Sequence, residues 1–479
     1  MVLQKAPQRA RLWGYGLEGS EVTVYLSGPV THKTTPATVT AGIWRVTLDP
    51  VEAGGPYNVT AVSQNSSRTL TNVLFGDIWL CGGQSNMFFQ TSQIFNASEE
   101  LALSSKYPHV RLFMTAWGMS KTELTDLILV ELPWSEPTAR VLSQFSAVCW
   151  LFGRYMYDRL KYPIGLVESC WGGTPVEAWS SVRALKLCGL EDAEDRYLLP
   201  VSLRAQTQNS VLWNAMIHPL LNMTIYGVIW YQGEANAEYH KDEYNCSFPA
   251  MIDDWRLAFH QGSGWQTTPD FPFGFVQLAT YKENSTDDGF PEIRWHQTAD
   301  VGFVPNYRMK KTFMAVALDL PDKTSPYGTI HPRDKQDVAF RLTLGARAVA
   351  YDEQDVVFTG PFPNQIASSH VSINITYDQP VSVAKPKSLF EICCSEMKAP
   401  CGPGSLWVPA DIMDWGPTSV QLSARRCSDP TEAAAVRYAW TDWPCGFKAC
   451  PVYSTSGTLP APPFIIHRYN GEGNIWKNY

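Results

Sequence analysis

A serine in a glycine-rich turn is the part of this sequence best suited to chemistry. Ser85 follows the apolar run 78–81 and two glycines, within the string GGQSNM at residues 82–87. Where a strand turns into a helix, the first backbone N–H groups lack partners and favour negative charge. Such donors stabilise the oxyanion that forms when a serine attacks an ester carbonyl. Taken alone, the pattern also fits a serine that merely caps a helix.

Two further glycine-containing loops follow predicted strands. They are residues 171–174 (WGGT) and residues 230–236 (WYQGEAN). The N–H group of Gly173 is a candidate second oxyanion donor beside that of Ser85, the side-chain amide of Gln232 is a third, and Glu234 is placed to orient that amide. One glycine pair can be simple turn punctuation, but three such loops at strand ends favour an oxyanion site.

A serine nucleophile needs a general base, and His331 is the candidate. It lies in the string GTIHP at residues 328–332, between the apolar run 312–318 and a helix that Pro332 would open. A histidine near a helix start often serves only local hydrogen bonding. The other histidines fit less well, because they fall in helical or apolar stretches (His218, His296) or look exposed (His240, His260).

The elements that must position these residues alternate between strand and helix, which predicts an α/β fold: a parallel sheet with helices on both faces. Ligands of such sheets bind beyond the carboxyl ends of the strands, where all three loops and His331 would lie. The expected strands cover residues 78–81, 164–167, 227–231, 273–278 and 312–318, and the expected helices cover 147–160, 249–259 and 332–351.

Two β domains are expected to flank this catalytic domain. Alternating apolar residues at 22–26, 44–48 and 59–62 predict a β-sandwich over residues 1–70, which leaves 71–351 for the α/β domain. Residues 352–479 show strand-like runs and carry six of the 11 cysteines: Cys393, Cys394, Cys401, Cys427, Cys445 and Cys450. Without histidines at zinc-finger spacing, this pattern favours disulfides over a metal site.

Charge and composition exclude several classes. The 479 residues hold 38 Lys and Arg against 46 Asp and Glu, a net charge of −8, which argues against a nucleic-acid partner. The sequence has no apolar run of about 18 residues, so no membrane span is expected. It contains no His-Glu-x-x-His string or clustered thiolates, so neither a metal nor an organic cofactor is expected.

Seven Asn-x-Ser/Thr acceptor sequences suggest N-glycans and a secretory history. They begin at Asn58, Asn65, Asn96, Asn222, Asn245, Asn284 and Asn374. The first residues, 1–11, have no apolar core of a signal peptide. We therefore expect a lysosomal or secreted protein whose leader has been removed, or a cytosolic form made without one.

Four strings in order resemble the sialate O-acetylesterase family, a branch of the SGNH hydrolase superfamily. They are GDIWLCGGQSNM (76–87), WGGTPVEAW (171–179), WYQGE (230–234) and IHPRDK (330–335). The resemblance extends from VLQK at 2–5 to RYAW at 437–440. It implies an SGNH-type sheet and a serine esterase that removes O-acetyl groups from sialic acids or sialoglycans through an acyl-enzyme on Ser85.

The resemblance leaves the remaining site residues open. Many SGNH enzymes carry an Asp two or three residues before the histidine, but here these positions hold Thr329 and Gly328. Asp319 is our candidate third triad member; Asp322 or a backbone carbonyl could instead orient the imidazole. Because sialic acid carries a carboxylate, Arg294 is proposed to bind it. Trp171 and Glu234 are further candidates for contacting the sugar.

Two other functions also fit the sequence. One is an acetyl esterase that acts on another acetylated carbohydrate. The other is a catalytically inert sugar-binding protein whose aromatic-rich β domains serve as lectin modules, since 18 Trp and 21 Tyr are distributed along the chain.

Overall fold

The computed structural model describes residues 1–64, 66–191, 205–384, 388–396, 401–402, 404–427, 431–469 and 475–477. The chain forms two compact units. The first comprises Met1–Gln232, Ser247–Gly274 and Lys335–Ala346, and the second comprises Gly233–Cys246, Phe275–Asp334 and Arg347–Tyr479. The three-domain division at residues 70/71 and 351/352 stays a prediction. Asn65 lies outside the described residues.

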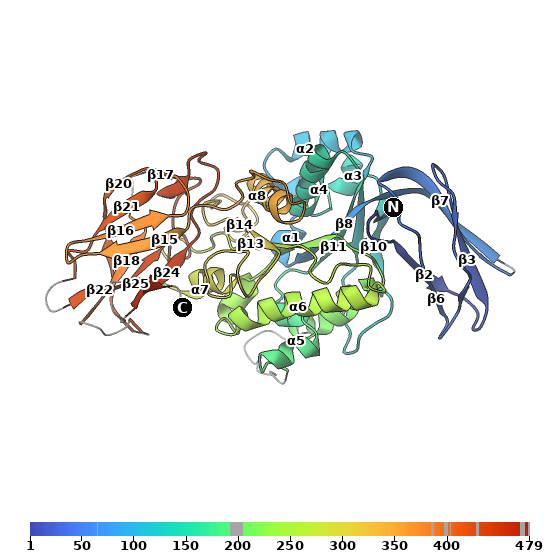
Figure 1. Ribbon diagram of the computed structural model, residues 1–479, viewed down its shortest axis with the longest axis horizontal. Coiled ribbons are helices and arrows are strands. Elements are labelled where there is room, and N and C mark those ends of the chain that lie inside the picture. The colour runs from blue at the N-terminus through green and yellow to red at the C-terminus, as the bar shows by residue number, and fades with distance from the viewer. Residues whose placement is uncertain are drawn as a thin grey trace. The chain divides into compact units, whose positions relative to one another are not determined.

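A mostly parallel sheet forms the centre of the first unit (Figure 1). Its strands run in the order β10 (Val130–Ser135), β9 (Val110–Thr115), β11 (Ile164–Cys170), β8 (Ser66–Gly83) and β12 (Gly227–Tyr231). β11, β8 and β12 pair in parallel, as predicted, and β9, which was not predicted, pairs in parallel with β11. The edge strand β10 departs from the predicted parallel sheet, because it pairs with β9 in the antiparallel direction. This edge strand is largely exposed and contains Pro133, so it lacks the apolar run that marks a buried strand.

Helices cover both faces of this sheet, which confirms the predicted α/β class. Figure 1 shows α4 (Ala147–Leu160) on one side of the strands and α6 (Tyr244–Gly262) on the other. The Oγ of Ser146 caps α4 by accepting the N–H of Cys149 at 3.2 Å. A disulfide between Cys81 and Cys149 ties α4 to β8. The first unit also contains the short α-helices α1 (Ser85–Phe88), α2 (Ala97–Leu103), α3 (Ala139–Leu142) and α5 (Val182–Leu187).

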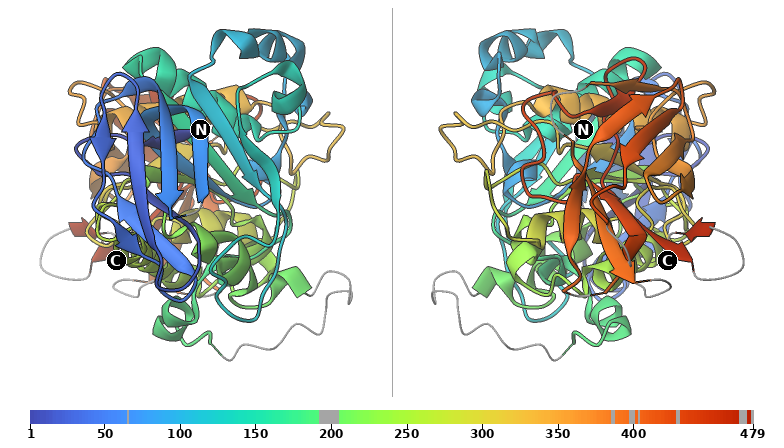
Figure 2. Two further views of the ribbon diagram at one scale, coloured as in Figure 1. Left: turned by 90° about the vertical axis from the view of Figure 1, so that its right-hand side faces the viewer. Right: turned by 90° about the vertical axis from the view of Figure 1, so that its left-hand side faces the viewer.

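The N-terminal strands share β8 with the central sheet (Figure 2, left). The early part of this 18-residue strand pairs with β7 (Gly54–Ser63), and its later part pairs with β11 and β12. The remaining strands are β1 (Val2–Gln4), β3 (Glu21–Ser27), β4 (His32–Lys33), β5 (Ala37–Thr38) and a separate ribbon of β2 (Arg11–Tyr15) with β6 (Ile43–Thr47). Alternate residues of β3, such as Val22, Val24 and Leu26, face a buried apolar core, as their spacing predicted.

The second unit contains the neighbouring strands β13 (Phe273–Gln277, which begins in the first unit) and β14 (Thr312–Val316). Helix α7 (Gly289–His296) follows β13. Helix α8 spans Lys335–Val349 and belongs mostly to the first unit. It begins three residues later than Pro332, where the sequence predicted its start.

The C-terminal part of the second unit is all β (Figure 2, right). Two sheets run in the orders β15-β16-β21-β20 and β19-β18-β22-β24-β25, and β17 pairs with β23. The strands are β15 (Pro363–Ser368), β16 (Ser372–Tyr377), β17 (Val381–Val383), β18 (Phe390–Glu396), β19 (Trp407–Ala410), β20 (Ile412–Trp415), β21 (Ser419–Ser423), β22 (Thr431–Tyr438), β23 (Val452–Ser454), β24 (Phe464–Tyr469) and β25 (Ile475–Lys477).

The predicted C-terminal disulfides are confirmed. They join Cys393 to Cys401, Cys394 to Cys427 and Cys445 to Cys450. Cys170 is a free thiol buried at the end of β11. Within the described residues, no helix combines the length and apolar character needed to span a bilayer.

Candidate active site

The carboxyl ends of three adjacent strands are level with one another. Gly83, the last residue of β8, lies opposite Cys170 at the end of β11 and opposite Tyr231 at the end of β12. The chain leaves the sheet at these points into the loops that contain Ser85, Trp171 and Gln232. The structure therefore brings these three loops together at one edge of the sheet.

Close backbone packing places Ser85. Gly83 has φ +139°, and a Cβ atom there would lie 2.1 Å from the carbonyl oxygen of Tyr231. The N–H of Gln84 donates to that oxygen at 2.9 Å, and the N–H of Trp171 donates to the Gly83 carbonyl at 3.1 Å. Ser85 is then the first residue of α1 and is half-buried. Glycine is required at position 83 because no side chain fits between the two strands.

The loop that carries the candidate donor Gly173 packs against this serine. A Cβ atom on Gly172 would lie 3.2 Å from the Cβ of Ser85, so the WGGT loop packs directly against the serine. Gly173 is exposed, with φ +70° and open space around it. The amide Nε2 of the buried Gln232 donates to the carbonyl of Thr174 at 3.2 Å, which fixes the plane of the amide. Glu234 is buried and begins a short helical turn, Glu234–Glu238, in the second unit.

A buried lysine that the sequence reasoning missed holds Asn86, the residue after Ser85. Lys335 is 1% exposed, and its Nζ donates to the Oδ1 of Asn86 at 2.6 Å. The ammonium also lies 4.8 Å from the ring centre of Phe89 and 5.3 Å from that of Tyr231, both within cation–π range. Lys335 closes the IHPRDK string, and its place in that string was the available signal.

The candidate base lies in a tight turn of the second unit. The Nδ1 of His331 is 2.8 Å from the carbonyl oxygen of Tyr327. A carbonyl can only accept, so Nδ1 carries the hydrogen, and in a neutral imidazole Nε2 is then the unprotonated nitrogen. The N–H of His331 donates to Gly328, and Ser325 Oγ donates to the carbonyl of His331 at 2.7 Å. A backbone carbonyl therefore orients the imidazole.

The two acidic candidates near this turn have other partners. The guanidinium of Arg333 binds Asp322 through two bonds of 2.6 and 2.9 Å. Burial would raise the pKa of Asp322, but its hydrogen bonds with Arg333 and the charge of that residue outweigh burial and lower it. Asp319 is fully buried and accepts the hydroxyl of Tyr453 at 3.0 Å. Its role beside His331 stays a prediction.

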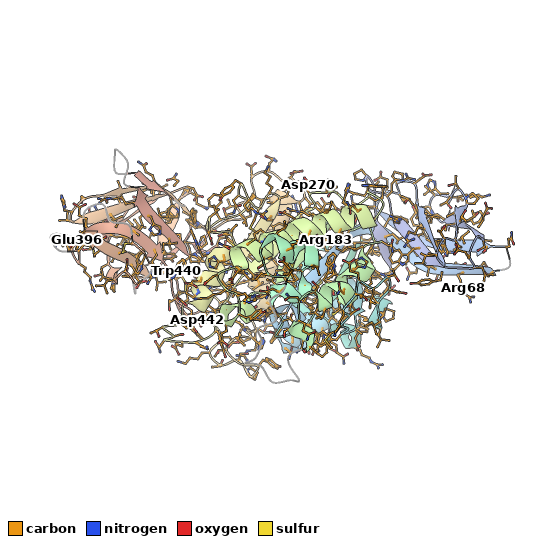
Figure 3. The ribbon with its side chains drawn as sticks, turned by 90° about the horizontal axis from the view of Figure 1, so that it is seen from below. Arg68, Arg183, Asp270, Glu396, Trp440 and Asp442 are labelled. Carbon is orange, nitrogen blue, oxygen red and sulfur yellow. A yellow bond between two sulfur atoms is a disulfide. The ribbon has the colours of Figure 1, made fainter. Side chains whose placement is uncertain are left out.

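Arg294 does not present its guanidinium to a ligand, which corrects the predicted carboxylate clamp. It is fully buried on α7 and donates to the carbonyl oxygens of Leu278, Ala279, Thr441 and Asp442 at 2.7–2.8 Å. Figure 3 labels Asp442, whose carboxylate also accepts the backbone N–H groups of Tyr281 and Lys282. Arg294 thus joins two loops of the second unit. Its sequence context, a helical stretch after a strand, did not reveal this burial.

A buried acid lies two residues before the end of β11. Glu168 is 1% exposed, accepts the N–H of Ser146 at 2.8 Å and the thiol of Cys170 at 3.2 Å. Burial raises its pKa to about 8, against the lowering effect of these two hydrogen bonds. The carboxyl is therefore mostly neutral at pH 7. It belongs to the strand that leads into the loop with Trp171.

An aromatic wall stands beside Ser85. The ring of Trp117 stacks on that of Trp171 with centroids 5.1 Å apart and planes 12° from parallel. The indole N–H of Trp117 donates to the Cys170 carbonyl, and the ring of Trp117 also contacts that of Phe88 in α1. Trp117 is 52% exposed. The sequence reasoning missed it because the preceding strand, β9, was not predicted; an apolar run at 110–114 was the available signal.

One group of metal-type side chains occurs among the described residues, away from these loops. One ligand atom each from Asp242, Glu292 and His296 lies within 4.8 Å of the others. Lys241 Nζ pairs with Glu292 at 2.6 Å, and the imidazole pairs with Asp300 at 2.5 Å. Glu292 and His296 thus already have partners within the protein, so we assign the cluster no metal.

The glycosylation candidates differ in exposure. Asn58, Asn96, Asn284 and Asn374 are exposed. Asn222 and Asn245 are half-buried; the first accepts a bond from Arg45 and the second donates its amide to Asp300 at 2.6 Å. A glycan on Asn245 would displace that bond, so occupancy is better suited to the four exposed sites.

The geometry of these loops agrees with what comparison with known proteins shows. A sheet with loops gathered at the carboxyl ends of its strands is typical of α/β enzymes that bind small ligands there. Residues 75–327 match the family described as carbohydrate esterase, sialic acid-specific acetylesterase, and residues 364–468 match the sialate O-acetylesterase C-terminal domain. The chain belongs to this family of carbohydrate esterases.

Full-length relatives support the same assignment. The chain is 49% identical to sialate O-acetylesterase of Mus musculus, with 97% of this chain and 92% of the relative covered. It is 50% identical to the Homo sapiens protein, with 97% and 90% covered. A crystal structure of a carbohydrate acetylesterase from Xanthomonas citri is similar, with a TM-score of 0.80, 27% identity, and coverage of 98% of this chain and 97% of that one.

Proposed function

We propose that this protein hydrolyses O-acetyl esters of sialic acids through an acetyl-enzyme on Ser85. The observation that carries the proposal is the level arrangement of three strand ends, which places Ser85 against the WGGT loop and near Gln232. The family match and the relatives of about 50% identity support the substrate class.

The mechanism is acyl transfer in two steps. His331 Nε2 removes the proton of Ser85 Oγ while the oxygen attacks the acetyl carbonyl carbon, and the imidazolium then protonates the departing sugar oxygen. Water, deprotonated by the same imidazole, attacks the acetyl-enzyme and releases acetate and free Ser85. The N–H groups of Ser85 and Gly173 and the amide of Gln232 stabilise both tetrahedral oxyanions.

Two features support the pairing of Ser85 with His331. The Tyr327 carbonyl holds the imidazole in the tautomer that a base requires, with Nε2 unprotonated. Lys335 contacts Asn86, which follows Ser85, and it is four residues beyond His331 in the sequence.

The decisive experiment labels the protein with a fluorophosphonate and maps the adduct by mass spectrometry. We expect one adduct on Ser85, its loss in His331→Ala, and a fall of more than about 10⁴-fold in kcat for Ser85→Ala on O-acetylated sialic acid. Equal activity of Ser85→Ala and wild type would overturn the proposal. Sugar binding without turnover in the wild type would favour the inert lectin, and preference for acetylated xylan would favour the other esterase.

Trp117 and Trp171 are proposed to form the stacking surface for the sugar, in place of the Arg294 clamp. Trp117→Ala should raise the KM for an O-acetyl sialoside about fivefold, since removing one aromatic contact costs on the order of 1 kcal/mol. Hydrolysis of a small aryl acetate, which has no sugar to stack, should change by less than about twofold. Equal loss on both substrates would contradict the assignment.

The cellular setting remains a proposal: a lysosomal or secreted protein with N-glycans on some of its acceptor sites. The three C-terminal disulfides and the exposure of Asn58, Asn96, Asn284 and Asn374 support it. Glycosidase treatment of the protein from its native cells should reduce its mass; an unchanged mass would argue for the cytosolic form.

A further inference from the structure

A short stretch of the C-terminal β domain lies against the loops around the candidate base. Residues 441–453 run from the end of β22 into β23 and include one of the three C-terminal disulfides. They contact the loop that follows β13 and the loop that follows β14, both in the same compact unit. The second of these loops leads into the His331 turn, so this stretch is placed to hold the base.

Asp442 binds the loop after β13 through its carboxylate (Figure 3). It is 2% exposed; its Oδ1 accepts the N–H of Tyr281 at 2.7 Å, and its Oδ2 accepts that of Lys282 at 3.0 Å. The guanidinium of Arg294 strengthens the contact by donating to the carbonyl oxygens of Ala279 and Asp442 at 2.7 and 2.8 Å. Both carboxylate oxygens are thus used, and an amide, which has one accepting oxygen, could not replace them.

The same loop is bonded to the His331 turn. The hydroxyl of the half-buried Thr329 donates to the carbonyl oxygen of Tyr281 at 2.7 Å. Tyr281 therefore binds Asp442 through its N–H and Thr329 through its carbonyl. Thr329 lies two residues before His331, where many SGNH enzymes carry an acid. In this protein the side chain at that position anchors the turn to the neighbouring loop.

A second contact holds the chain that leads to the turn. The N–H of Lys448 donates to the carbonyl oxygen of Asp319 at 2.7 Å, and the hydroxyl of Tyr453 donates to the carboxylate of Asp319 at 3.0 Å. The segment between residues 319 and 329 is therefore held at both ends, at the first directly by the C-terminal stretch and at the second through Tyr281. A movement of either anchor would displace the imidazole.

We propose that Asp442 is a positioning residue for ester hydrolysis, acting on His331 through Tyr281 and Thr329. The inference rests on the proposed function, since His331 is the proposed base. A displacement of about 1 Å in a reacting group can cost as much as about a hundredfold in rate. The C-terminal β domain thereby affects the chemical step as well as the stability of the fold.

The first test measures steady-state kinetics of the full chain on an O-acetyl sialoside. Asp442→Asn keeps the size of the side chain and removes one accepting oxygen, so kcat should fall about tenfold. Thr329→Val removes a single neutral hydrogen bond, so kcat should fall about threefold. KM should change by less than about twofold in both variants, because the effect passes through the base. An unchanged kcat in both, or in Thr329→Val alone if Asp442→Asn does not fold, would overturn the inference.

Labelling of Ser85 with a fluorophosphonate separates misplacement of the base from loss of folded protein. The reaction needs the activated serine and no contact with the sugar. A misplaced imidazole lowers the rate constant of labelling and leaves the final extent equal to that of the wild type. Partial unfolding lowers the final extent and leaves the rate constant of the remaining protein unchanged. The second pattern in Asp442→Asn and Thr329→Val would overturn the positioning role.

Double-mutant cycles test the route from Asp442 to the base. In the His331→Ala background, Asp442→Asn should cause no further loss of residual activity, because the imidazole through which it acts is absent. Combined with Thr329→Val, it should cost less than the product of the two single losses. A further tenfold loss without the imidazole, or the full product of losses, would contradict the route through Tyr281.

Two matched controls lie in the same unit. Thr312→Val removes a hydroxyl that donates to the Met309 carbonyl at 2.8 Å, and Asp378→Asn alters a carboxylate that accepts the N–H of Phe362 at 3.0 Å. Both controls should leave kcat within about twofold of the wild type. Losses as large as those of the matched test variants would contradict a specific effect of Asp442.

The outcomes also separate this inference from the proposed function. Full activity of His331→Ala would contradict the proposed function. Loss of activity in His331→Ala together with unchanged kcat in Asp442→Asn and Thr329→Val would contradict only the positioning role of Asp442.

Discussion

The loops that carry Ser85 and His331 are built in different ways. The Ser85 loop is held by backbone atoms: Gly83 packs against the Tyr231 carbonyl, and neighbouring strands exchange hydrogen bonds around it. The His331 turn is held largely by side chains, through the Arg333–Asp322 pair and the hydroxyl of Ser325. Backbone packing tolerates almost no substitution, whereas side-chain contacts can be weakened in steps.

The two loops also have acids with opposite pKa shifts. Glu168, behind the serine loops, is neutral through burial, and its pKa is raised to about 8. Asp322, beside the candidate base, is also buried, yet its pKa is lowered because its hydrogen bonds with Arg333 and the charge of that residue outweigh the burial. A neutral buried carboxyl therefore lies near the Ser85 loop, whereas an ion pair lies beside the His331 turn.

The largest effect is expected when alanine substitutions at two glycines, one in each loop, are compared. Gly83→Ala places a Cβ atom 2.1 Å from a carbonyl oxygen and should cost more than about 3 kcal/mol of unfolding free energy and abolish activity. Gly328→Ala, in the His331 turn at φ +88° with open space, should cost about 1–2 kcal/mol. Urea unfolding of both variants measures the difference. Similar losses would show that the two loops do not differ in this way.

The next effect is a pH dependence of stability. The folded chain holds the Glu168 proton up to about pH 8, whereas the unfolded chain releases it near the ordinary value of 4.5, so rising pH within this window destabilises the fold. Relative to Glu168→Gln, the wild type should lose up to about 3 kcal/mol between pH 5.5 and 7.5. Parallel curves of unfolding free energy against pH would show that Glu168 is ionised in the folded protein.

A smaller effect concerns the lysine beside the nucleophile. Lys335→Met should lower kcat about 30-fold with little change in KM, since a hydrogen bond to a charged group contributes about 2 kcal/mol and Asn86 would lose its orientation. Gln336→Ala, the adjacent position whose amide donates to the Phe95 carbonyl, is the matched control. In a double-mutant cycle, Asn86→Ala should remove most of the effect of Lys335→Met; additive losses would argue against coupling.

The smallest effect is expected at the base turn. Arg333→Ala should lower kcat/KM about fivefold, because the partly exposed ion pair with Asp322 contributes about 1 kcal/mol to holding the turn. Arg333→Lys keeps the charge and loses the two-bond geometry, so its kcat/KM should lie between those of the wild type and Arg333→Ala. Steady-state kinetics on an O-acetyl sialoside gives the comparison. A loss as large as that of Lys335→Met would mean that side-chain contacts position the base as strictly as they position Asn86.

Much of the architecture was predictable from sequence because buried parallel strands and capped helices leave strong local patterns. Residues 147–160 and 227–231 form α4 and β12 with the predicted bounds. The edge strand β10 was not predicted, because an exposed strand that contains a proline lacks an apolar run. The start of α8 was placed three residues too early, because the residues after Pro332 are held by the Asp322–Arg333 pair. Local patterns cannot show such long-range contacts.

The placement of the candidate residues was predictable where a residue type and a strand end coincide, as for Ser85 and Gln232. Arg294, Lys335 and Trp117 show the limit of this reasoning. Whether a charged side chain faces solvent or four carbonyl oxygens depends on loops far apart in sequence, such as residues 278–279 and 441–442 around Arg294. The partner of Lys335 is likewise about half the chain away, at Asn86.

The length of β8 has a mechanical consequence. One continuous strand carries Arg68 near its start and Gly83 at its end, and at about 3.3 Å per residue the stretch between them spans up to about 50 Å. Any force applied to the outer strands, for instance by a tethered polymer, is transmitted along a covalent backbone to the turn before Ser85. For the same reason, a break anywhere between residues 66 and 83 would interrupt the strand that leads into the turn before Ser85.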